Sequence, residues 1–294
     1  MSSGRDEYLE KFSEKPLNYH KMQQKFQIFI PKPQHYMSWQ AFYELAEVIK
    51  YGLEDLGHEC LIRHFIEPTR RNIIIGCHLL NENSMHEVPK NTIIINTESL
   101  EFDMDKWNDR IIKWCNNFET WDYSEKNLKY LPHAKHLDIG YHSRMRRVVN
   151  NERETFLDKD IDVLFYGGIT QRRATIINGL MDAGLTVETL FGVFGSIRDS
   201  YIARSKVVLN MHRGDSTDFE MVRCFYLMTN AKAIVAESDK QIDGIHCVNY
   251  DNLVESCVSL VNDDKARYKL EQSAINAIYG RPQNKILERL LCDA

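Results

Sequence analysis

The sequence lacks several features that would assign a class directly. No stretch approaches the roughly 20 consecutive apolar residues that cross a bilayer, and the first residues are too polar for a secretory signal. The seven cysteines are an odd number without a C-x-x-C pair, which favours reduced packing thiols. The histidines are scattered, whereas zinc ligands are clustered. We therefore expect a cytoplasmic protein without an integral membrane segment or a metal.

A strong charge of either sign is also missing. The net charge is -5, from 37 Lys and Arg against 42 Asp and Glu, so no overall cationic field favours nucleic-acid binding. A local basic group remains at 142–147 (HSRMRR). The 294 residues are 43% hydrophobic, which is enough for a substantial core, and their number favours two compact halves.

Short apolar runs alternate twice with longer amphipathic segments, a rhythm typical of βα units that build parallel sheets. In the first half we expect strands at 25–31, 60–65, 71–77, 92–96 and 135–141, and helices at 38–57, 103–115 and 124–131. In the second half we expect strands at 161–167, 185–191, 206–212 and 231–237, helices at 169–184, 195–205 and 218–230, a helix from Asn252 and a C-terminal helix. The expected fold class is α/β, with two Rossmann-like doubly wound domains that face a cleft.

The segment 143–160 loses apolar periodicity and gathers charge, as a connector between domains does. We expect an N-terminal domain at 1–145, a linker at 146–159 and a C-terminal domain at 160–294, with the last helix packing back on the N-terminal domain. Ligands of such sheets bind at the C-terminal ends of the strands. The chemistry is therefore expected in the loops that follow the strands.

The stretch FYGGITQRR places Gly167 and Gly168 between a strand and a helix. Glycine lets the backbone approach a ligand, and a helix N-terminus offers unpaired N–H groups to phosphate. Arg172 and Arg173 add permanent charge, so the pattern predicts a pyrophosphate site. The alternative is an ordinary turn followed by surface arginines. No G-x-G-x-x-G or G-x-x-x-x-G-K-[ST] pattern occurs, which disfavours classical dinucleotide and P-loop sites.

Two further clusters follow predicted strands. In FGVFGS, Val193 and Phe194 lie between glycines and can present backbone groups and an aromatic face to a base, or simply connect a strand to a helix. In DFEMVRCFYLMTN, Glu220 and Arg223 are three residues apart on one helix face. The carboxylate can accept two ribose hydroxyls and the guanidinium can bind phosphate, whereas the alternative is a solvated ion pair.

Several motifs in order carry a resemblance to a known family. DVLFYGGITQRR, LFGVFGSIRDSYIARSKVVLNMH and FEMVRCFYLMTNAKAIVAE resemble the C-terminal half of a bacterial and viral group of GT-B glycosyltransferases, distantly similar to spore-maturation-type, glycosyltransferase family 1-like enzymes. IIINTESLEF and FETWDYSEKNLKYL are similar to that group's N-x-E strand end and W-D-Y-S-x-x-N helix start. The resemblance covers roughly residues 92–255.

The resemblance implies that the C-terminal domain holds a nucleotide-sugar donor while the acceptor faces the N-terminal domain. It places Gly167, Gly168, Arg172 and Arg173 at the diphosphate, Val193 and Phe194 near the base, Glu220 and Arg223 at ribose and phosphate, and Asn210 and His212 beside them. The chain departs from the pattern at Arg213 and Gly214, where relatives have aromatic residues, so the sugar and the acceptor stay open.

Glycosyl transfer needs a positioned acceptor oxygen, a base if the configuration inverts, and stabilisation of the departing diphosphate. Glu98 and His35 each follow a predicted strand and are the candidate catalytic residues; a retaining mechanism requires neither as a base. Arginines and a helix terminus can stabilise the diphosphate without metal. The D-x-D patterns at 103–105 and 158–160 lie in charged segments away from apolar strand ends, so we predict no metal ligands.

We therefore predict a metal-independent hexosyl- or pentosyltransferase that needs no cofactor besides its nucleotide-sugar co-substrate. The acceptor hydroxyl belongs to a glycan or to modified DNA. Three alternatives remain open: a transferase that acts on a modified base in DNA, a nucleic-acid-binding protein that uses 142–147 with Arg172 and Arg173, and a non-catalytic module that binds nucleotide sugar.

Overall fold

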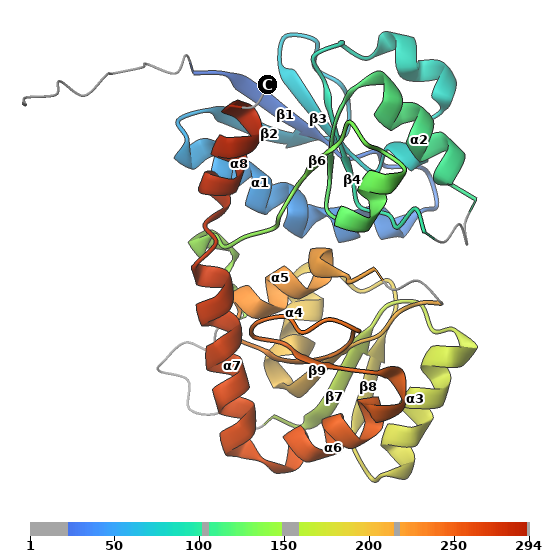
Figure 1. The fold of residues 1–294 in the computed structure, drawn as a ribbon, viewed down its shortest axis with the longest axis vertical. Helices are drawn as coiled ribbons and strands as arrows, with labels where there is room; N and C mark the ends of the chain where they lie inside the picture. Colours follow the sequence, from blue (N-terminus) through green and yellow to red (C-terminus); the bar gives the residue numbers. More distant parts are fainter. Residues whose placement is uncertain (1–22, 102–105, 149–158, 215–217, 293–294) are drawn as a thin grey trace, which may run out of the picture.

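The computed structural model describes residues 23–101, 106–148, 159–214 and 218–292. These residues form two α/β domains stacked along the long axis of the molecule, each built on a parallel sheet (Figure 1). Among the described residues, no helix is both long and apolar enough to cross a bilayer.

The N-terminal domain contains a six-stranded sheet in the order β2-β1-β3-β4-β5-β6. Its strands are β1 (Lys25–Phe29), β2 (Glu59–Arg63), β3 (Arg71–Ile75), β4 (Ile93–Asn96), β5 (Glu119–Asp122) and β6 (Lys135–His136). Helix α1 (Tyr43–Asp55) covers one face and α2 (Asn108–Asn117) the other. Both faces are therefore buried, which explains the continuous isoleucine runs of β3 and β4.

The C-terminal domain contains a five-stranded sheet in the order β11-β10-β9-β7-β8. Its strands are β7 (Ile161–Tyr166), β8 (Val187–Leu190), β9 (Ser205–Asn210), β10 (Ala233–Glu237) and β11 (His246–Val248). Its helices are α3 (Gln171–Asp182), α4 (Gly195–Arg204), α5 (Met221–Thr229), α6 (Leu253–Asn262) and α7 (Asp264–Tyr279). Helices again cover both faces of the sheet.

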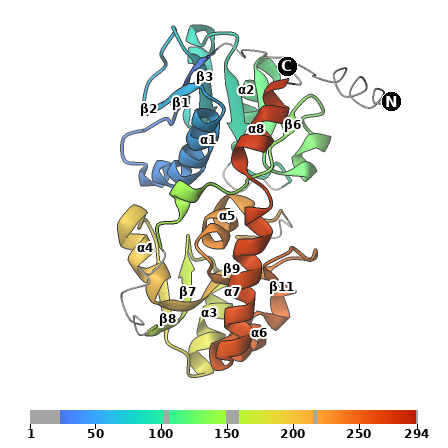
Figure 2. The same cartoon turned by 90° about the vertical axis from the view of Figure 1, so that its left-hand side faces the viewer.

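The last helix, α8 (Gln283–Cys292), leaves the C-terminal domain and packs on α1 of the N-terminal domain (Figure 2). Two segments thus cross between the domains, one around Tyr141 and the other around Arg281 and Pro282. They lie side by side. The backbone N–H of Tyr141 donates to Arg281 O at 2.8 Å, and Gln283 N–H donates to Tyr141 O at 2.9 Å. These bonds take the place of sheet pairing at Tyr141, where we expected the end of a strand. Closer to β6, the Leu137 N–H still donates to Asp122 O of β5 at 2.7 Å.

Other elements differ from the sequence-based expectation. The expected helix at 124–131 is a 3-10 segment, Glu125–Lys129, and β5 and β11 were not predicted at all. The single expected C-terminal helix is two, α7 and α8, separated at the domain crossing. The helix expected at 103–115 begins at Asn108; residues 103–105 and linker residues 149–158 lie outside the described residues.

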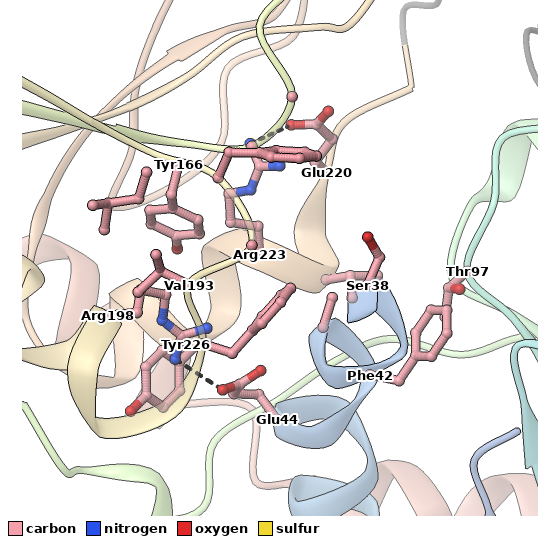
Figure 3. A pocket seen from close by; sticks show the side chains of 18 of the residues that line it. Ser38, Phe42, Glu44, Thr97, Tyr166, Val193, Arg198, Glu220, Arg223 and Tyr226 are labelled. Carbon is pink, nitrogen blue, oxygen red and sulfur yellow. Dashed lines mark hydrogen bonds and ion pairs between the residues drawn. The ribbon is translucent and has the colours of Figure 1, made fainter. Parts of the chain in front are cut away.

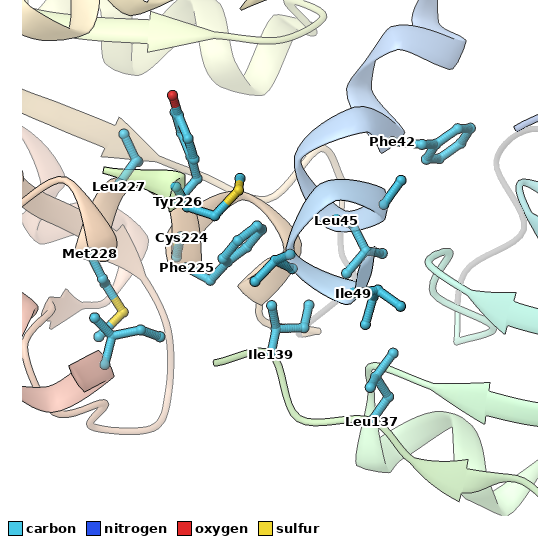
Figure 4. Packing of buried hydrophobic residues seen from close by; sticks show 14 of the residues in the cluster. Phe42, Leu45, Ile49, Leu137, Ile139, Cys224, Phe225, Tyr226, Leu227 and Met228 are labelled. Carbon is cyan, nitrogen blue, oxygen red and sulfur yellow. The ribbon is translucent and has the colours of Figure 1, made fainter. Parts of the chain in front are cut away.

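One hydrophobic cluster runs through both domains. Leu45 and Ile49 of α1 pack in the same cluster as Ile139 of the crossing segment and Phe225 and Tyr226 of α5 (Figure 4). The two domains therefore share a core and are not joined by the crossing segments alone.

Candidate active site

A cavity of about 330 Å³ lies between the domains at the C-terminal ends of their strands. We call its first side the N-terminal wall, formed by Ser38, Ala41, Phe42, Glu44, Thr97, Glu98 and Tyr123. We call its second side the C-terminal wall, which includes Tyr166, Gly167, Gly168, Val193, Phe194, Arg198, Glu220, Arg223 and Tyr226. Figure 3 shows side chains from both walls pointing into one space.

The Gly167–Gly168 turn lies where β7 ends. Gly167 has a φ of 141°, a backbone conformation that favours glycine. A Cβ atom at Gly167 would lie 3.4 Å from the Arg223 Nη2 atom and 3.6 Å from the Arg173 Nη1 atom. Two guanidinium groups therefore pack directly against this turn.

Arg173 lies behind the turn and does not line the cavity. Its side chain is 3% exposed and donates to Gly168 O at 2.9 Å, Met211 O at 2.6 Å and His212 O at 3.2 Å. Burial lowers the pKa of Arg173 to about 10, so the group stays charged at neutral pH. It therefore fixes the turn to the end of β9 from beneath.

Arg172 does not line the cavity either. Its guanidinium forms a two-point ion pair with Glu237 at the end of β10 and lies 3.8 Å from the ring centre of Tyr250. The first turn of α3 is also capped, because the Thr170 hydroxyl accepts from Arg173 N–H at 3.4 Å. Neither arginine lines the cavity, and protein groups bind both side chains. That they contact a diphosphate stays a prediction.

Glu220 and Arg223 do line the cavity, at the start of α5. Arg223 Nη1 donates to Glu220 Oε2 at 3.2 Å (Figure 3). It also donates to Asn210 Oδ1 at 2.9 Å, while Glu220 Oε1 lies 3.4 Å from Arg173 Nη2. Burial opposes the charge of Arg223, but Glu220 together with Tyr166 and Cys224 outweighs burial and raises the pKa of Arg223. The carboxylate is held between two permanent cations.

Asn210 and His212 support this pair from outside the cavity lining. Asn210 is fully buried, and its amide Nδ2 has no hydrogen-bond partner among the described residues. His212 is 5% exposed, and its backbone N–H donates to Glu237 Oε2 at 3.0 Å. Asn210 therefore positions Arg223, and His212 holds the segment that follows β9.

Val193 and Phe194 line the cavity in the loop between β8 and α4. Gly192 and Gly195 flank them with φ values of 70° and 60°, which fixes a sharp turn. The loop forms the apolar end of the C-terminal wall. That this end binds a base stays a prediction.

Glu98 lines the cavity from the opposite side, and a buried hydrogen-bond cluster holds its backbone. The side-chain amides of Asn96 and Asn127 both donate to Glu98 O at 2.9 Å, and Glu98 N–H donates to Asn96 Oδ1 at 3.1 Å. Asp122 accepts from both asparagines, at 2.8 and 2.9 Å. Burial raises the pKa of Asp122 to about 6. The N-x-E and W-D-Y-S-x-x-N patterns therefore form one cluster under Glu98.

His35, the other candidate base, is exposed and does not line the cavity. The histidine beside Glu98 is instead His78, whose Nε2 lies 4.0 Å from Glu98 Oε1 and whose ring stacks on Trp107 at 4.3 Å. Sequence analysis missed His78 because it follows a strand with no motif around it.

Sequence analysis also missed an ion pair that joins the two walls. Arg198 of α4 donates to Glu44 Oε1 of α1 at 2.8 Å (Figure 3). It also donates to Asp199 Oδ1 at 2.8 Å. Arg198 is 5% exposed and Glu44 is 8% exposed. Burial opposes the charge of Arg198, but Glu44 together with Tyr166 and Asp199 outweighs burial and raises the pKa of the guanidinium. The partners are 154 residues apart, so no local pattern indicates the pair.

Among the described residues, no group of three or more His, Cys, Asp and Glu is arranged to hold a metal ion. Of the two D-x-D patterns, residues 103–105 and Asp158 lie outside the described part. Asp160 pairs with Arg204, and Lys159 pairs with Glu271 at 2.7 Å. Metal independence stays a prediction.

No protein-family model matches the sequence. Two similar proteins come from Acanthamoeba polyphaga mimivirus and carry no described activity. Uncharacterized protein L140 is 26% identical over 253 residues, which cover 85% of this chain and 78% of L140. Uncharacterized protein L137 is 25% identical over 230 residues, which cover 74% of this chain but only 30% of L137. The chain thus spans less than a third of that relative.

Three solved structures share the architecture over nearly the whole chain. AviGT4, a glycosyltransferase involved in avilamycin A biosynthesis, superposes with a TM-score of 0.57 at 12% identity over 91% of this chain and 96% of its own. An alpha-glucosyltransferase in complex with UDP and a 13-mer DNA gives 0.59 at 9% identity over 92% and 99%. WaaG, a glycosyltransferase involved in lipopolysaccharide biosynthesis, gives 0.53 at 9% identity over 90% and 98%. The chain therefore has the GT-B glycosyltransferase fold, with two Rossmann-like domains that face each other across a cleft.

Proposed function

We propose that the protein is a metal-independent glycosyltransferase that moves a hexosyl or pentosyl group from a nucleoside-diphosphate sugar to an acceptor hydroxyl. One observation carries this proposal. The Glu220–Arg223 pair on the C-terminal wall and the Glu98 carboxylate on the N-terminal wall face the same cavity. This arrangement supports a donor site and a base on opposite sides of the cavity.

The C-terminal wall suits a nucleotide sugar. The start of α5 lies at the cavity, where Glu220, Val222 and Arg223 line it, and the positive end of the helix dipole suits a phosphate group. Arg223 adds a cation that stays charged, and Glu220 can accept two ribose hydroxyls. These groups stabilise a diphosphate without a metal ion.

Glu98 supplies the proton chemistry. As the acceptor oxygen forms its bond to the anomeric carbon, the Glu98 carboxylate takes the hydroxyl proton. The bond from that carbon to the diphosphate oxygen breaks, and its electron pair leaves on the diphosphate, where Arg223 stabilises the charge. Glu98 then releases the proton to solvent.

The shared fold supports this proposal by analogy, since AviGT4 and WaaG are glycosyltransferases and the alpha-glucosyltransferase binds UDP. The site residues carry the greater weight, because one fold supports many activities.

A plain nucleic-acid-binding function has less support, because the basic segment 142–147 is largely neutralised. Arg144 pairs with Glu54 at 2.7 Å, and Arg147 pairs with Glu47 at 2.8 Å. Acidic side chains of α1 therefore cancel charges that phosphates would require. A non-catalytic sensor would have no need of a carboxylate at Glu98.

Donor binding is tested by thermal shift against a panel of nucleoside diphosphates and their sugars. A ligand that binds only the folded state raises the melting temperature. We expect one diphosphate to do so, and we expect Glu220→Gln and Arg223→Ala to abolish the shift. Arg146→Ala and Glu255→Gln are the controls, because both side chains are exposed and lie outside the cavity lining. If all four variants bind the diphosphate like the parent, the site assignment is wrong.

Turnover is tested by the release of nucleoside diphosphate from the donor that binds. We expect Glu98→Gln to lower kcat about 100-fold or more while donor binding stays unchanged. His35→Ala is the matched comparison, since it removes the other candidate base, and it should retain activity. Activity should also persist in EDTA. Full activity of Glu98→Gln would exclude this carboxylate as the base.

A further inference from the structure

The N-terminal wall has an unusual charge composition for a cleft that binds an anionic donor. Its described residues include two carboxylates, Glu44 and Glu98, and no Lys, Arg or His. Of the described residues that line the cavity, the cations are Arg198 and Arg223, and both belong to the C-terminal wall. Arg198 pairs with Glu44, so one of the two carboxylates is already balanced by a cation of the other wall.

The environment of Tyr123 shows that this side of the cavity is electronegative. Burial raises the pKa of the Tyr123 phenol well above its usual value, and the carboxylates of Asp218, Glu98 and Glu220 raise it further. A second negative group placed here would meet the same repulsion. Phosphate or carboxylate groups are thus disfavoured next to Tyr123.

The rest of the wall offers neutral polar and aromatic contacts. Thr97 Oγ1 is shielded from solvent and has no hydrogen-bond partner among the described residues, although Thr97 lines the cavity. A ligand hydroxyl that reaches this oxygen would give it the hydrogen bond that it lacks. Phe42 and Tyr123 add aromatic surface, which packs against the C–H face of a sugar ring.

We propose that the N-terminal wall binds an uncharged saccharide acceptor, so that the enzyme extends a neutral glycan and does not modify DNA. Carboxylate and hydroxyl groups bind sugar hydroxyls, and aromatic rings bind their apolar faces. Duplex DNA carries about one negative charge per 1.7 Å of its axis and needs cations that this wall lacks. The inference rests on the proposed transferase function.

The test compares acceptors with the donor that binds in the thermal-shift screen. Release of nucleoside diphosphate is measured without acceptor, with a panel of neutral mono- and oligosaccharides, with the matching uronates, and with duplex DNA that carries hydroxymethylpyrimidines. We expect at least tenfold stimulation by one neutral saccharide, weaker stimulation by its uronate, and none by DNA.

The outcomes separate the two proposals. Stimulation by DNA alone, or by no neutral saccharide, would overturn the acceptor assignment, while donor binding would still support a nucleotide-sugar enzyme. A protein that binds no nucleoside diphosphate would overturn the proposed function itself.

A matched pair of variants tests the wall directly. Thr97→Val preserves shape and removes the hydroxyl, so we expect the acceptor KM to rise about tenfold with the donor KM unchanged. Thr92→Val is the control, because Thr92 is also buried with an unpartnered hydroxyl but lies at the other end of β4, outside the cavity lining. Equal acceptor KM values for the two variants, or a change in donor KM alone for Thr97→Val, would contradict the proposal.

Discussion

Asp122 lies in a buried hydrogen-bond cluster beneath Glu98. It is fully buried and accepts hydrogen bonds from Asn96, Asn127 and the backbone N–H of Ser124, but no Lys or Arg among the described residues pairs with it. Burial outweighs these hydrogen bonds and raises its pKa from 3.8 to about 6. The cluster that holds Glu98 therefore contains a carboxylate that titrates near neutral pH.

The raised pKa predicts how stability depends on pH. Because the folded state holds this proton more tightly than the unfolded chain, the contribution of Asp122 is most favourable below pH 4 and is lost as the pH rises through about 6. The loss is on the order of 2–3 kcal/mol. Asp122→Asn cannot ionise and loses hydrogen bonds at every pH.

The measurement is urea unfolding of both proteins between pH 4 and pH 7.5. As the pH rises, the unfolding free energy of the parent should fall relative to that of Asp122→Asn. The difference between the two proteins should become constant above pH 7. A difference that does not change over this range would show that Asp122 titrates normally.

The direction of individual side chains was beyond sequence analysis. Parallel strands carry ligand-binding loops at their C-terminal ends, and this rule alone predicts that Glu98, Gly167 and Glu220 lie near the cleft. It does not say where two adjacent arginines point. Arg172 turns to Glu237 and Arg173 to backbone carbonyls, because buried acceptors at the ends of β9 and β10 require donors.

At the scale of elements, the longest strand and helix patterns were predictable, whereas the connections between domains were not. The alternation of Leu137 and Ile139 is typical of a strand, and both side chains are indeed buried. They are buried in the core shared by the two domains. The Leu137 N–H still donates to Asp122 O of β5, whereas Gly140 and Tyr141 bond to Arg281 and Gln283 in place of a sheet partner. Alternation of apolar and polar residues indicates an extended chain with one buried side and one exposed side. It does not indicate which segment the backbone pairs with.

The crossing segments predict a strong effect at Gly140. A Cβ atom there would lie 2.0 Å from Arg281 O, so Gly140→Ala must push the two crossing segments apart. We expect a loss of about 1–3 kcal/mol in the free energy of unfolding, as for other overpacked sites. Thermal or urea unfolding measures it.

Gly280 provides the matched control at the same crossing. Its φ of -65° suits alanine, and an added Cβ would come no closer than 3.9 Å to a neighbouring atom. Gly280→Ala should therefore be neutral or slightly stabilising. If both variants were equally stable, the contact between the crossing segments would not be tight.

At the scale of the whole molecule, the domains behave as one unit with a cavity between them. The shared apolar cluster joins α1 to α5, and polar contacts join the walls on either side of the cavity. Asp218 accepts from the Ser124 hydroxyl at 2.9 Å and from the Ser99 hydroxyl, while Arg198 binds Glu44. We therefore expect a single unfolding transition by calorimetry.

The buried Arg198–Glu44 pair should contribute a measurable coupling free energy between the two domains, whereas an exposed ion pair should not. Removing one partner of a buried pair leaves an uncompensated charge, although Asp199 still offsets part of that cost for Arg198. We expect Glu44→Gln to cost about 2 kcal/mol, and a double-mutant cycle with Arg198→Met to give a coupling energy of about 1–3 kcal/mol. Urea unfolding at 0.15 M salt provides the four free energies.

The Arg204–Asp160 pair is the control for this cycle, because it lies within the C-terminal domain with side chains 40% and 51% exposed. Solvent and salt screen such a pair, so its cycle should give no measurable coupling. If the Arg198–Glu44 cycle gave the same result, this ion pair would not hold the two walls together. The shared cluster of α1 and α5 would then account for the attachment of the domains by apolar packing alone.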